Sequence, residues 1–385
     1  MLRRQFLKTT TVAAALEACG LARPLYAAVP LIRTRWRIKT SEGFDALCFL
    51  GPLSGDPFYA DYYPQEIRAF RDKLPPGIEQ KTTMLFAQFR AAGALLGPGL
   101  CLLFSGGPTE TIGDLIAGLD AMETVLKPPF AASAYWDEAA WSGFANSRTV
   151  LREILLGMKA AGFSQFRRDC IDAQAAKRIP ELTARLAQLD TIAEQERLLG
   201  RTFADPTIEI ILLYFSKPHG IRIQGQRFLT SVDYPDYIVI RNADHELMHP
   251  PFEAGSAEMK AVFTVLLRDE LLTRIVRQHD PRFGYNSLEG LIDEDTVQAL
   301  EQIINEKFAV ADQPASRWHE SDDGMHVFAA GLYGLLKADG CDRTGGNIQH
   351  WLFNAANSGL LFPASLHAAA ARVLKRDVNH LWPLG

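Results

Sequence analysis

The sequence predicts an α+β protein that is mostly helical and has one small sheet of about three strands. Three observations predict this class. From about Pro64 to Gly200, apolar residues recur at every third or fourth position, the spacing of amphipathic helices. Between Pro206 and Arg241 the pattern changes to short runs of β-branched and aromatic residues, each bounded by Pro, Gly or Asp. Helical periodicity then returns and continues to the end of the chain.

The N-terminus predicts an export signal. Residues Arg3–Lys8 read RRQFLK, which resembles the twin-arginine motif, and the weakly apolar stretch that follows is too short and too polar to span a bilayer. We expect cleavage after Ala27, which removes residues 1–27 and leaves a periplasmic or extracellular protein. An alternative is a lipoprotein anchor at Cys19, but Glu17 puts a charge where such sequences have small apolar residues.

The rest of the chain is expected to form two regions. Residues 28–203 are predicted to be mostly helical; in one of these helices Ile112, Leu115 and Leu119 share a face. Residues 204–385 are predicted to contain the strands, the candidate site and the C-terminal helices. We found no internal repeat and no low-complexity segment in either region.

Three strands are expected at the start of the second region, at Ile208–Phe215, Ile221–Val232 and Tyr237–Ile240. A short connection should follow the third strand and lead into a helix. Asn242 is the expected N-cap of that helix, and Asp244 is expected in its first turn, where a carboxylate is favourable.

Composition excludes two classes of protein. The net charge is −5, and no block of like charges or basic patch with interleaved aromatic residues is present, so a nucleic-acid-binding protein is excluded. The longest uncharged stretch, Ala91–Thr109, is interrupted by two clusters of Gly and Pro, so we expect no membrane span and a soluble mature protein. Removing residues 1–27 takes away four basic residues and one acidic residue, so the net charge falls from −5 to −8.

Four cysteines remain in the mature chain: Cys48, Cys101, Cys170 and Cys341. They include no C-x-x-C pair, so they are not expected to bind a metal. In an oxidising compartment they could form up to two disulfides with three possible connectivities. Buried free thiols are an equally good interpretation for a core of this size.

Residues His245, Glu246 and His249 form an H-E-x-x-H motif. On a helix the two histidines lie four positions apart, so both imidazoles project from one face and can bind one metal ion. Glu246 lies beside them, where its carboxylate can accept a proton from a metal-bound water that then attacks a carbonyl carbon. Because Pro250 and Pro251 disfavour helical geometry, the helix is expected to kink or end near His249.

A catalytic zinc ion needs a third protein ligand, and Glu294 is the first candidate. It lies one turn before Val297 on the apolar face of a predicted helix, where a buried carboxylate without a partner is costly. A zinc ion would supply that partner. The alternative is that Glu294 lies in a solvated first turn and stabilises the helix N-terminus. The other candidate ligands are Glu289, which is the second choice, and then Glu258, Glu253 and His279.

These motifs resemble the gluzincin branch of zinc metallopeptidases, in which H-E-x-x-H is followed by a distant glutamate on a second helix. More narrowly, HELMHP and EDTVQA resemble an exported bacterial family of predicted metallopeptidases of unknown substrate, and so does the segment at residues 44–66. The resemblance implies a zincin-like fold, Zn²⁺ bound by the two histidines and Glu294, and Glu246 as the base. Gln298 departs from the family, which usually has Arg at that position.

The sequence indicates less clearly which side chains would donate hydrogen bonds to the oxyanion of a transition state. His326 and Tyr333 are seven residues apart on a predicted C-terminal helix, so they share a face and either could donate to an oxyanion. His319, in a predicted loop, is a further candidate. In peptidases that resemble this chain the substrate pairs as an extra strand along the edge of the sheet, and Arg222–Asp233 could present such an edge.

Two classes of function are therefore expected. The first is an exported zinc-dependent hydrolase, specifically a metallopeptidase that acts on a peptide or protein, with Glu246 as general base. The second is a non-catalytic envelope protein or pseudoenzyme whose metal site is structural. A metal-dependent hydrolase of a non-peptide bond is a third hypothesis.

Overall fold

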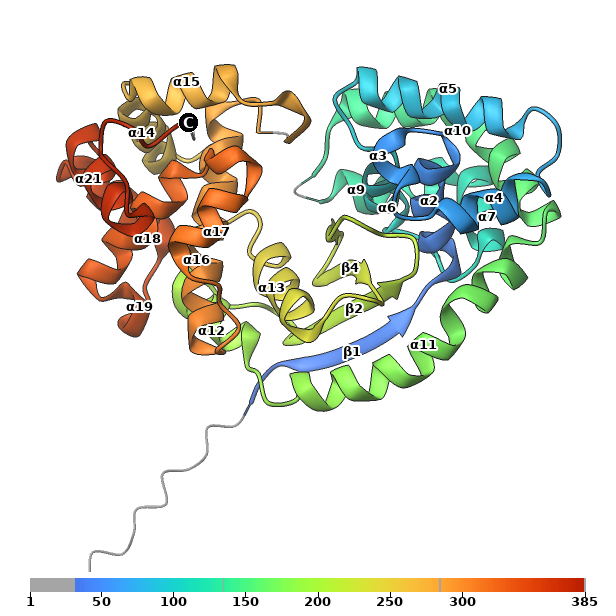
Figure 1. Cartoon of the computed structure of the whole chain (residues 1–385), viewed down its shortest axis with the longest axis horizontal. Helices are drawn as coiled ribbons and strands as arrows, with labels where there is room; N and C mark the ends of the chain where they lie inside the picture. Colours follow the sequence, from blue (N-terminus) through green and yellow to red (C-terminus); the bar gives the residue numbers. More distant parts are fainter. Residues whose placement is uncertain (1–31, 134, 284, 384–385) are drawn as a thin grey trace, which may run out of the picture. The chain divides into compact units, whose positions relative to one another are not determined.

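The computed structural model describes residues 32–133, 135–283 and 285–383. The predicted signal peptide, its cleavage after Ala27 and the alternative anchor at Cys19 lie outside the described residues, so export stays a prediction. The compact unit that contains the fold begins at Arg33. It is mostly helical and has one small mixed sheet of four strands (Figure 1). The α+β class with a small sheet is confirmed, and the division between residues 203 and 204 stays a prediction.

Helices dominate the chain on both sides of the strands, as the periodicity predicts. The first part consists of β1 (Arg35–Thr40), α2 (Glu42–Leu53), α3 (Pro57–Ala60), α4 (Pro64–Arg71), α5 (Ile78–Ala91), α6 (Leu96–Phe104), α7 (Ile112–Asp120), α8 (Met122–Val125), α9 (Lys127–Ala131), α10 (Glu138–Ala160), α11 (Phe163–Leu186) and α12 (Thr191–Leu199). The other strands are β2 (Thr207–Leu213), β3 (Ile221–Ile223) and β4 (Arg227–Ser231). The last part consists of α13 (Asp236–Glu246), α14 (Ala257–Leu266), α15 (Glu270–Gln278), η1 (Pro281–Phe283), α16 (Leu288–Lys307), α17 (Pro314–Glu320), η2 (Asp322–Gly324), α18 (Val327–Asp339), α19 (Cys341–Thr344), α20 (Ile348–Asn357) and α21 (Pro363–Leu374).

The sheet has the strand order β1-β2-β4-β3. Strands β1, β2 and β4 are parallel, and β3 pairs antiparallel with β4 at one edge. Strand β2 is buried from Ile208 to Leu213, which is typical of a strand covered on both faces. Because side chains alternate along a strand, Ile211 packs with the N-terminal helices on one face, and Ile210 packs with α11 and α13 on the other.

The number of strands exceeds the prediction by one, because β1 is not predicted. Its sequence RWRIKT has three basic residues and reads as polar; its buried partner β2 lies far along the chain. The predicted strand Ile208–Phe215 matches β2. The predicted strand Ile221–Val232 is instead the hairpin of β3 and β4, which turns at Gly225 with φ of 79°, a conformation that glycine adopts without strain.

The predicted strand Tyr237–Ile240 is wrong, because these residues lie in α13. A run of four apolar residues does not distinguish a strand from a buried helix, and here only Val239 and Ile240 of the run join the buried face of a helix that starts after Pro235. Asn242 is therefore not an N-cap, and its amide donates to the Thr230 hydroxyl at 3.0 Å. Asp244 lies near the end of the helix and not in its first turn, and burial raises its pKa well above the usual range.

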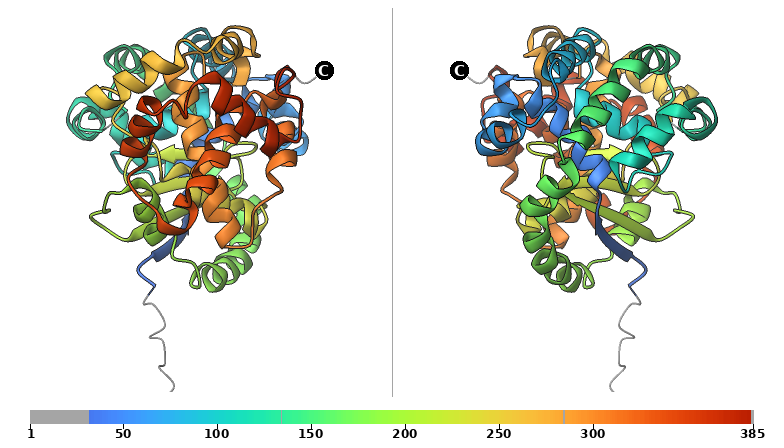
Figure 2. Two further views of the ribbon diagram at one scale, coloured as in Figure 1. Left: turned by 90° about the vertical axis from the view of Figure 1, so that its left-hand side faces the viewer. Right: turned by 90° about the vertical axis from the view of Figure 1, so that its right-hand side faces the viewer.

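Helix α16 lies among the C-terminal helices, which face the viewer in the left panel of Figure 2. Every residue from Leu291 to Asn305 except Asp293 is buried. The helix contacts α12, α13, α15 and α18. Polar side chains persist on so buried a helix only where partners satisfy them. Its contact with α13 brings the acidic residues of α16 to the end of the H-E-x-x-H helix.

Two further expectations concern the cysteines and the absence of a membrane span. The four described cysteines are free, and Cys48 of α2 and Cys101 of α6 have their sulfur atoms 3.7 Å apart. Burial raises the pKa of the Cys101 thiol well above its usual range.

Among the described helices, none is long and apolar enough to cross a membrane alone; α5 and α6 pass that test only as a pair bent by 87°.

Candidate metal centre

The H-E-x-x-H motif lies at the C-terminal end of α13. His245 and Glu246 are the last two residues of the helix, Leu247 is its C-cap, and His249 follows in the turn before Pro250. The helix thus ends near His249, as the two prolines predict. The imidazoles still meet, because the Nε2 atoms of His245 and His249 lie 3.2 Å apart.

Glu294 of α16 faces both histidines. One of its carboxylate oxygens lies 3.5 Å from Nε2 of His245, and the other lies 3.5 Å from Nε2 of His249. Nitrogen and oxygen ligands about 2.0–2.1 Å from a tetrahedral zinc ion are about 3.3–3.4 Å from one another. The observed separations are close to that value, so the three residues fit a metal ion. Within the part of the chain that the structure describes, these three residues form a group that could hold a metal ion.

A buried carboxylate orients His245. Its Nδ1 lies 3.0 Å from Glu301 of α16, one oxygen of which also accepts from Arg317 at 2.5 Å. The other oxygen of Glu301 accepts from the Asn305 amide at 2.8 Å. Because ionised Glu301 can only accept, Nδ1 carries the proton and Nε2 presents its lone pair to the centre.

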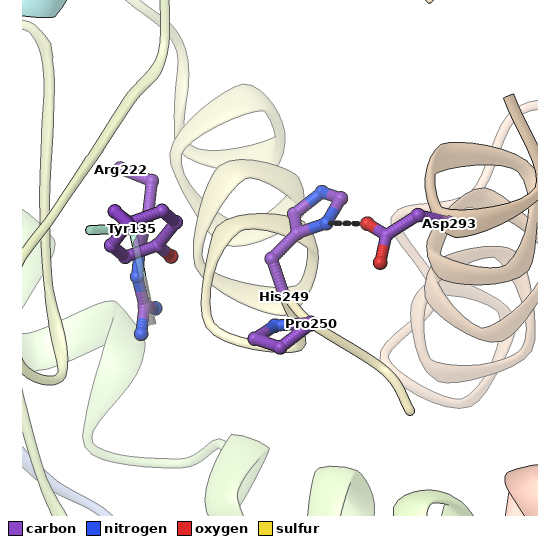
Figure 3. A pocket seen from close by; sticks show the side chains of 5 residues that line it. All are labelled: Tyr135, Arg222, His249, Pro250 and Asp293. Atoms are coloured by element: carbon purple, nitrogen blue, oxygen red, sulfur yellow. Dashed lines mark hydrogen bonds and ion pairs between the residues drawn. The ribbon is translucent and has the colours of Figure 1, made fainter. Parts of the chain in front are cut away.

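A second carboxylate does the same for His249. Its Nδ1 lies 2.7 Å from Asp293 of α16, as the dashed line in Figure 3 marks. Glu294 is also held, because its Oε1 accepts from the Gln298 amide at 2.9 Å. The Trp318 indole donates to the Gln298 carbonyl at 3.0 Å and so fixes the orientation of that amide. Gln298, where the resembling family has Arg, therefore contacts the candidate ligand as a neutral donor.

The electrostatic field at this position favours a cation. Burial raises the pKa of Glu294, but the cationic forms of His245 and His249 outweigh it and hold the pKa well below its usual range. Burial lowers the pKa of His245, but Glu294 and Glu301 outweigh it and raise the pKa well above its usual range. Either protons on the histidines or one metal ion can balance the carboxylates.

The Glu246 side chain extends toward the edge of the sheet. A Cβ atom at Gly220, the residue before β3, would lie 3.3 Å from Oε1 of Glu246 and 3.0 Å from Nδ2 of Asn242. Glycine at this position therefore lets the chain at the start of β3 approach the carboxylate closely. Arg222 of β3 holds the main chain, because its Nη1 donates to the Glu246 carbonyl at 2.8 Å.

An open pocket of about 320 Å³ lies beside these residues and is lined by Tyr135, Arg222, His249, Pro250 and Asp293. Figure 3 shows Tyr135 and Arg222 on one side of His249 and Asp293 on the other. Tyr135 comes from the segment between α9 and α10, whereas Asp293 comes from α16. The pocket therefore joins the N-terminal helices, the edge strand and the candidate ligands.

His326 lies in a different environment from the one expected of an oxyanion donor. It is fully buried at the start of α18, with Nδ1 2.6 Å from Asp295 and Nε2 2.9 Å from Asp322. Burial lowers the pKa of His326, but these carboxylates outweigh it and raise the pKa to about 10. Both ring nitrogens are thus engaged by carboxylates, of which Asp295 is buried and Asp322 is partly exposed.

Tyr333 and His319 also lie away from the three candidate ligands. The Tyr333 hydroxyl donates to Glu306, and its ring packs 5.5 Å from that of Trp318. His319 is in α17, so the predicted loop is wrong at that position. Among the described contacts, neither side chain touches His245, His249 or Glu294.

The alternative ligands are separated from the histidines or engaged elsewhere. Glu289 is exposed in the first turn of α16, and Glu253 is exposed after the two prolines. Glu258 accepts from a glutamine side chain at 2.8 Å, and His279 bonds to a main-chain carbonyl at 2.9 Å. Of the expected third ligands, the described residues bring only Glu294 to the two histidines.

Three residues near the candidate ligands, Asp293, Glu301 and Tyr285, are not predicted from the sequence. Glu301 has a signal, because it lies seven residues after Glu294 on the same helix face. No sequence pattern indicates Tyr285, which lies in the loop between η1 and α16. Its φ of 58° is an uncommon value that often marks a functional site. Burial raises its pKa, as do the nearby charges of Glu294 and Glu246.

We expect His326→Gln to lower the free energy of unfolding by about 3–5 kcal/mol, because it removes one partner of a buried ion pair. The folded pKa of His326, about 10, exceeds its unfolded value of about 6.5. Its stabilising contribution is therefore complete below about pH 6.5 and is lost as the pH rises towards 10. Denaturant unfolding of both proteins between pH 6 and pH 10 should show the difference narrowing with pH; a constant difference would contradict a charged His326.

A comparison of the chain with known protein families found no match, and neither did comparisons with characterised proteins and with solved structures.

Proposed function

We propose that this protein is an exported zinc-dependent hydrolase, and specifically a metallopeptidase of the zincin-like class. The observation that carries the proposal is the geometry of His245, His249 and Glu294. Their ligand atoms lie 3.2–3.5 Å apart, and each histidine is held through Nδ1 by a carboxylate. Export rests on the RRQFLK sequence alone.

The donor set supports zinc over harder cations. Two imidazoles and one carboxylate are the ligands of catalytic zinc sites that keep one position open, whereas structural zinc sites have four protein ligands. Calcium and magnesium prefer all-oxygen sites. A zinc ion held by these residues would act as a Lewis acid, polarising a carbonyl group and lowering the pKa of its water to about 7.

Glu246 supplies the base in this proposal. It directly follows one candidate ligand in the chain, and its carboxylate approaches the start of the edge strand at Gly220. It would accept the proton of the attacking water and then deliver it to the leaving amine. Glu301 and Asp293 would keep the histidine tautomers fixed during this proton transfer.

A peptide substrate suits the edge of the sheet. Strand β3 pairs with β4 on one side only, so its other side can accept an extended chain by β-augmentation. The predicted edge at Arg222–Asp233 corresponds to the β3–β4 hairpin, of which β3 is the edge strand. An extended peptide there would pass the pocket beside His249.

Metal analysis of the purified protein tests the proposal. We expect about one zinc ion per chain and a melting temperature that falls after chelation, because a ligand at a hundred times its dissociation constant adds about 2.7 kcal/mol. His380→Ala, which removes an exposed histidine, is the matched control and should keep the zinc. No bound zinc and an unchanged melt would overturn the metal site; bound zinc without hydrolysis of a peptide library would favour a non-catalytic metal site or a non-peptide substrate.

A further inference from the structure

The pocket beside His249 contains an arginine without an acidic partner. Arg222 uses one guanidinium N–H to hold the Glu246 carbonyl at 2.8 Å. Within the described part of the chain, Arg222 forms no ion pair with an aspartate or glutamate, and its buried Nε has no hydrogen-bond partner. An arginine has five N–H donors in a planar fork, so donors beyond the one that holds Glu246 remain for a ligand.

Tyr135 adds a second donor to the same side of the pocket. Its hydroxyl is buried beside the Arg222 guanidinium and interacts with it, although no contact of the hydroxyl within the described residues meets strict hydrogen-bond geometry. Burial raises the pKa of Tyr135, so the hydroxyl keeps its proton at neutral pH. Because an arginine can only donate, the proton of the Tyr135 hydroxyl still has no acceptor among the described residues, which indicates a group that a ligand would satisfy.

A second guanidinium adds positive charge nearby. Arg201, which follows α12, donates from Nη2 to the Met248 carbonyl at 3.3 Å. Burial lowers the pKa of Arg201, and the positive charge of Arg222 lowers it further. Holding the carbonyls at the end of α13 is a structural role for both arginines. That role accounts for one donor on each and leaves the proton of the Tyr135 hydroxyl without an acceptor among the described residues.

The geometry points to a carboxylate-binding subsite, in which Arg222 and Tyr135 bind a carboxylate of the substrate beside the metal centre and Arg201 adds charge. This inference rests on the proposed function and narrows its substrates to peptides with a carboxylate next to the cleaved bond. Asp293 lines the same pocket, but His249 already engages its Oδ1. A carboxylate can accept two N–H donors of an arginine and a tyrosine hydroxyl at once, which an amide oxygen cannot do equally well.

Binding of paired thiol probes tests the subsite without requiring activity. We would titrate the zinc-loaded full chain with ω-mercapto acids of two to five methylene groups and with the corresponding amides. Binding of the thiol group shows that the metal ion is present and accessible. The ratio of the affinities for the acid and the amide measures the contribution of the carboxylate-binding subsite. We expect one chain length to favour the acid by about tenfold or more, the range of a charge-assisted hydrogen bond. Tyr135→Phe and Arg222→Gln should each lower that ratio at least threefold.

The controls separate the subsite from the metal centre. Tyr135→Phe removes only a hydroxyl and does not touch α13, so it keeps the test valid if Arg222→Gln unfolds the protein. Tyr237→Phe, at an exposed tyrosine, should leave the ratio unchanged. Equal affinity of wild type for acid and amide at every length, or a ratio that Tyr135→Phe does not change, would overturn the subsite. Failure of every thiol to bind would overturn the metal centre itself.

Peptide substrates then identify the source of the carboxylate. If the subsite binds the C-terminal carboxylate, a peptide with a free C-terminus should be cleaved about tenfold faster than its C-terminal amide. If it binds an acidic side chain, amidated peptides should retain the rate when Glu adjoins the cleaved bond and lose it when Gln replaces that Glu. In either case Tyr135→Phe should reduce the preference, and cleavage that is indifferent to both kinds of carboxylate would contradict the subsite.

Discussion

Glu246→Gln is expected to lower peptide hydrolysis by about 10²- to 10⁴-fold, the usual contribution of a general base. The amide keeps the shape of the side chain beside Gly220 but cannot accept a proton from the attacking water. None of the three candidate ligands is changed. The variant should therefore bind zinc as tightly as wild type and unfold at a similar temperature, so activity, metal content and melting are measured on the same preparation.

Glu253→Gln is the matched control for this substitution, because it makes the same chemical change at an exposed residue seven positions along the chain. It should keep full activity. A fully active Glu246→Gln enzyme would show that Glu246 is not the base and would contradict the proposed mechanism. Loss of zinc from Glu246→Gln would show instead that Glu246 contributes to the metal site.

Replacing His245, His249 or Glu294 with Ala is expected to abolish zinc binding and activity together. Each substitution removes one of the three ligand atoms that lie 3.2–3.5 Å apart, and a catalytic zinc site needs all three. Zinc affinity measured against a competing chelator, together with the hydrolysis rate, gives both results. Glu289→Ala, in the exposed first turn of the same helix, is the control and should change neither quantity.

The carboxylates that hold the histidines should give an intermediate result. Glu301→Gln and Asp293→Asn leave the three ligand atoms in place but weaken their orientation, so we expect a loss of about 10–100-fold in zinc affinity. A Glu294→Ala variant that binds zinc normally would remove Glu294 from the site. In that case the two histidines would need a third ligand from a different residue.

Local sequence patterns predicted the parts of the fold that depend on neighbouring residues. The helical regions, strand β2 and the end of the helix near Pro250 follow from periodicity and proline geometry over a few residues. Sequence patterns gave the wrong secondary structure where a short apolar run is compatible with both a strand and a helix. The run Tyr237–Ile240 reads equally well as a strand or as a buried helix, and packing between the sheet and α11 selects the helix.

For the candidate site, the sequence by itself determined the identities and spacing of His245, Glu246 and His249 and indicated Glu294 from one helix face. Only the tertiary structure decided which carboxylates meet the histidines, because α16 begins about 40 residues after the motif and its rotation against α13 depends on packing. The same holds for Tyr135, which reaches the pocket from the N-terminal helices. Contacts between residues distant in sequence leave no periodic signal, since their geometry follows from how whole elements pack together.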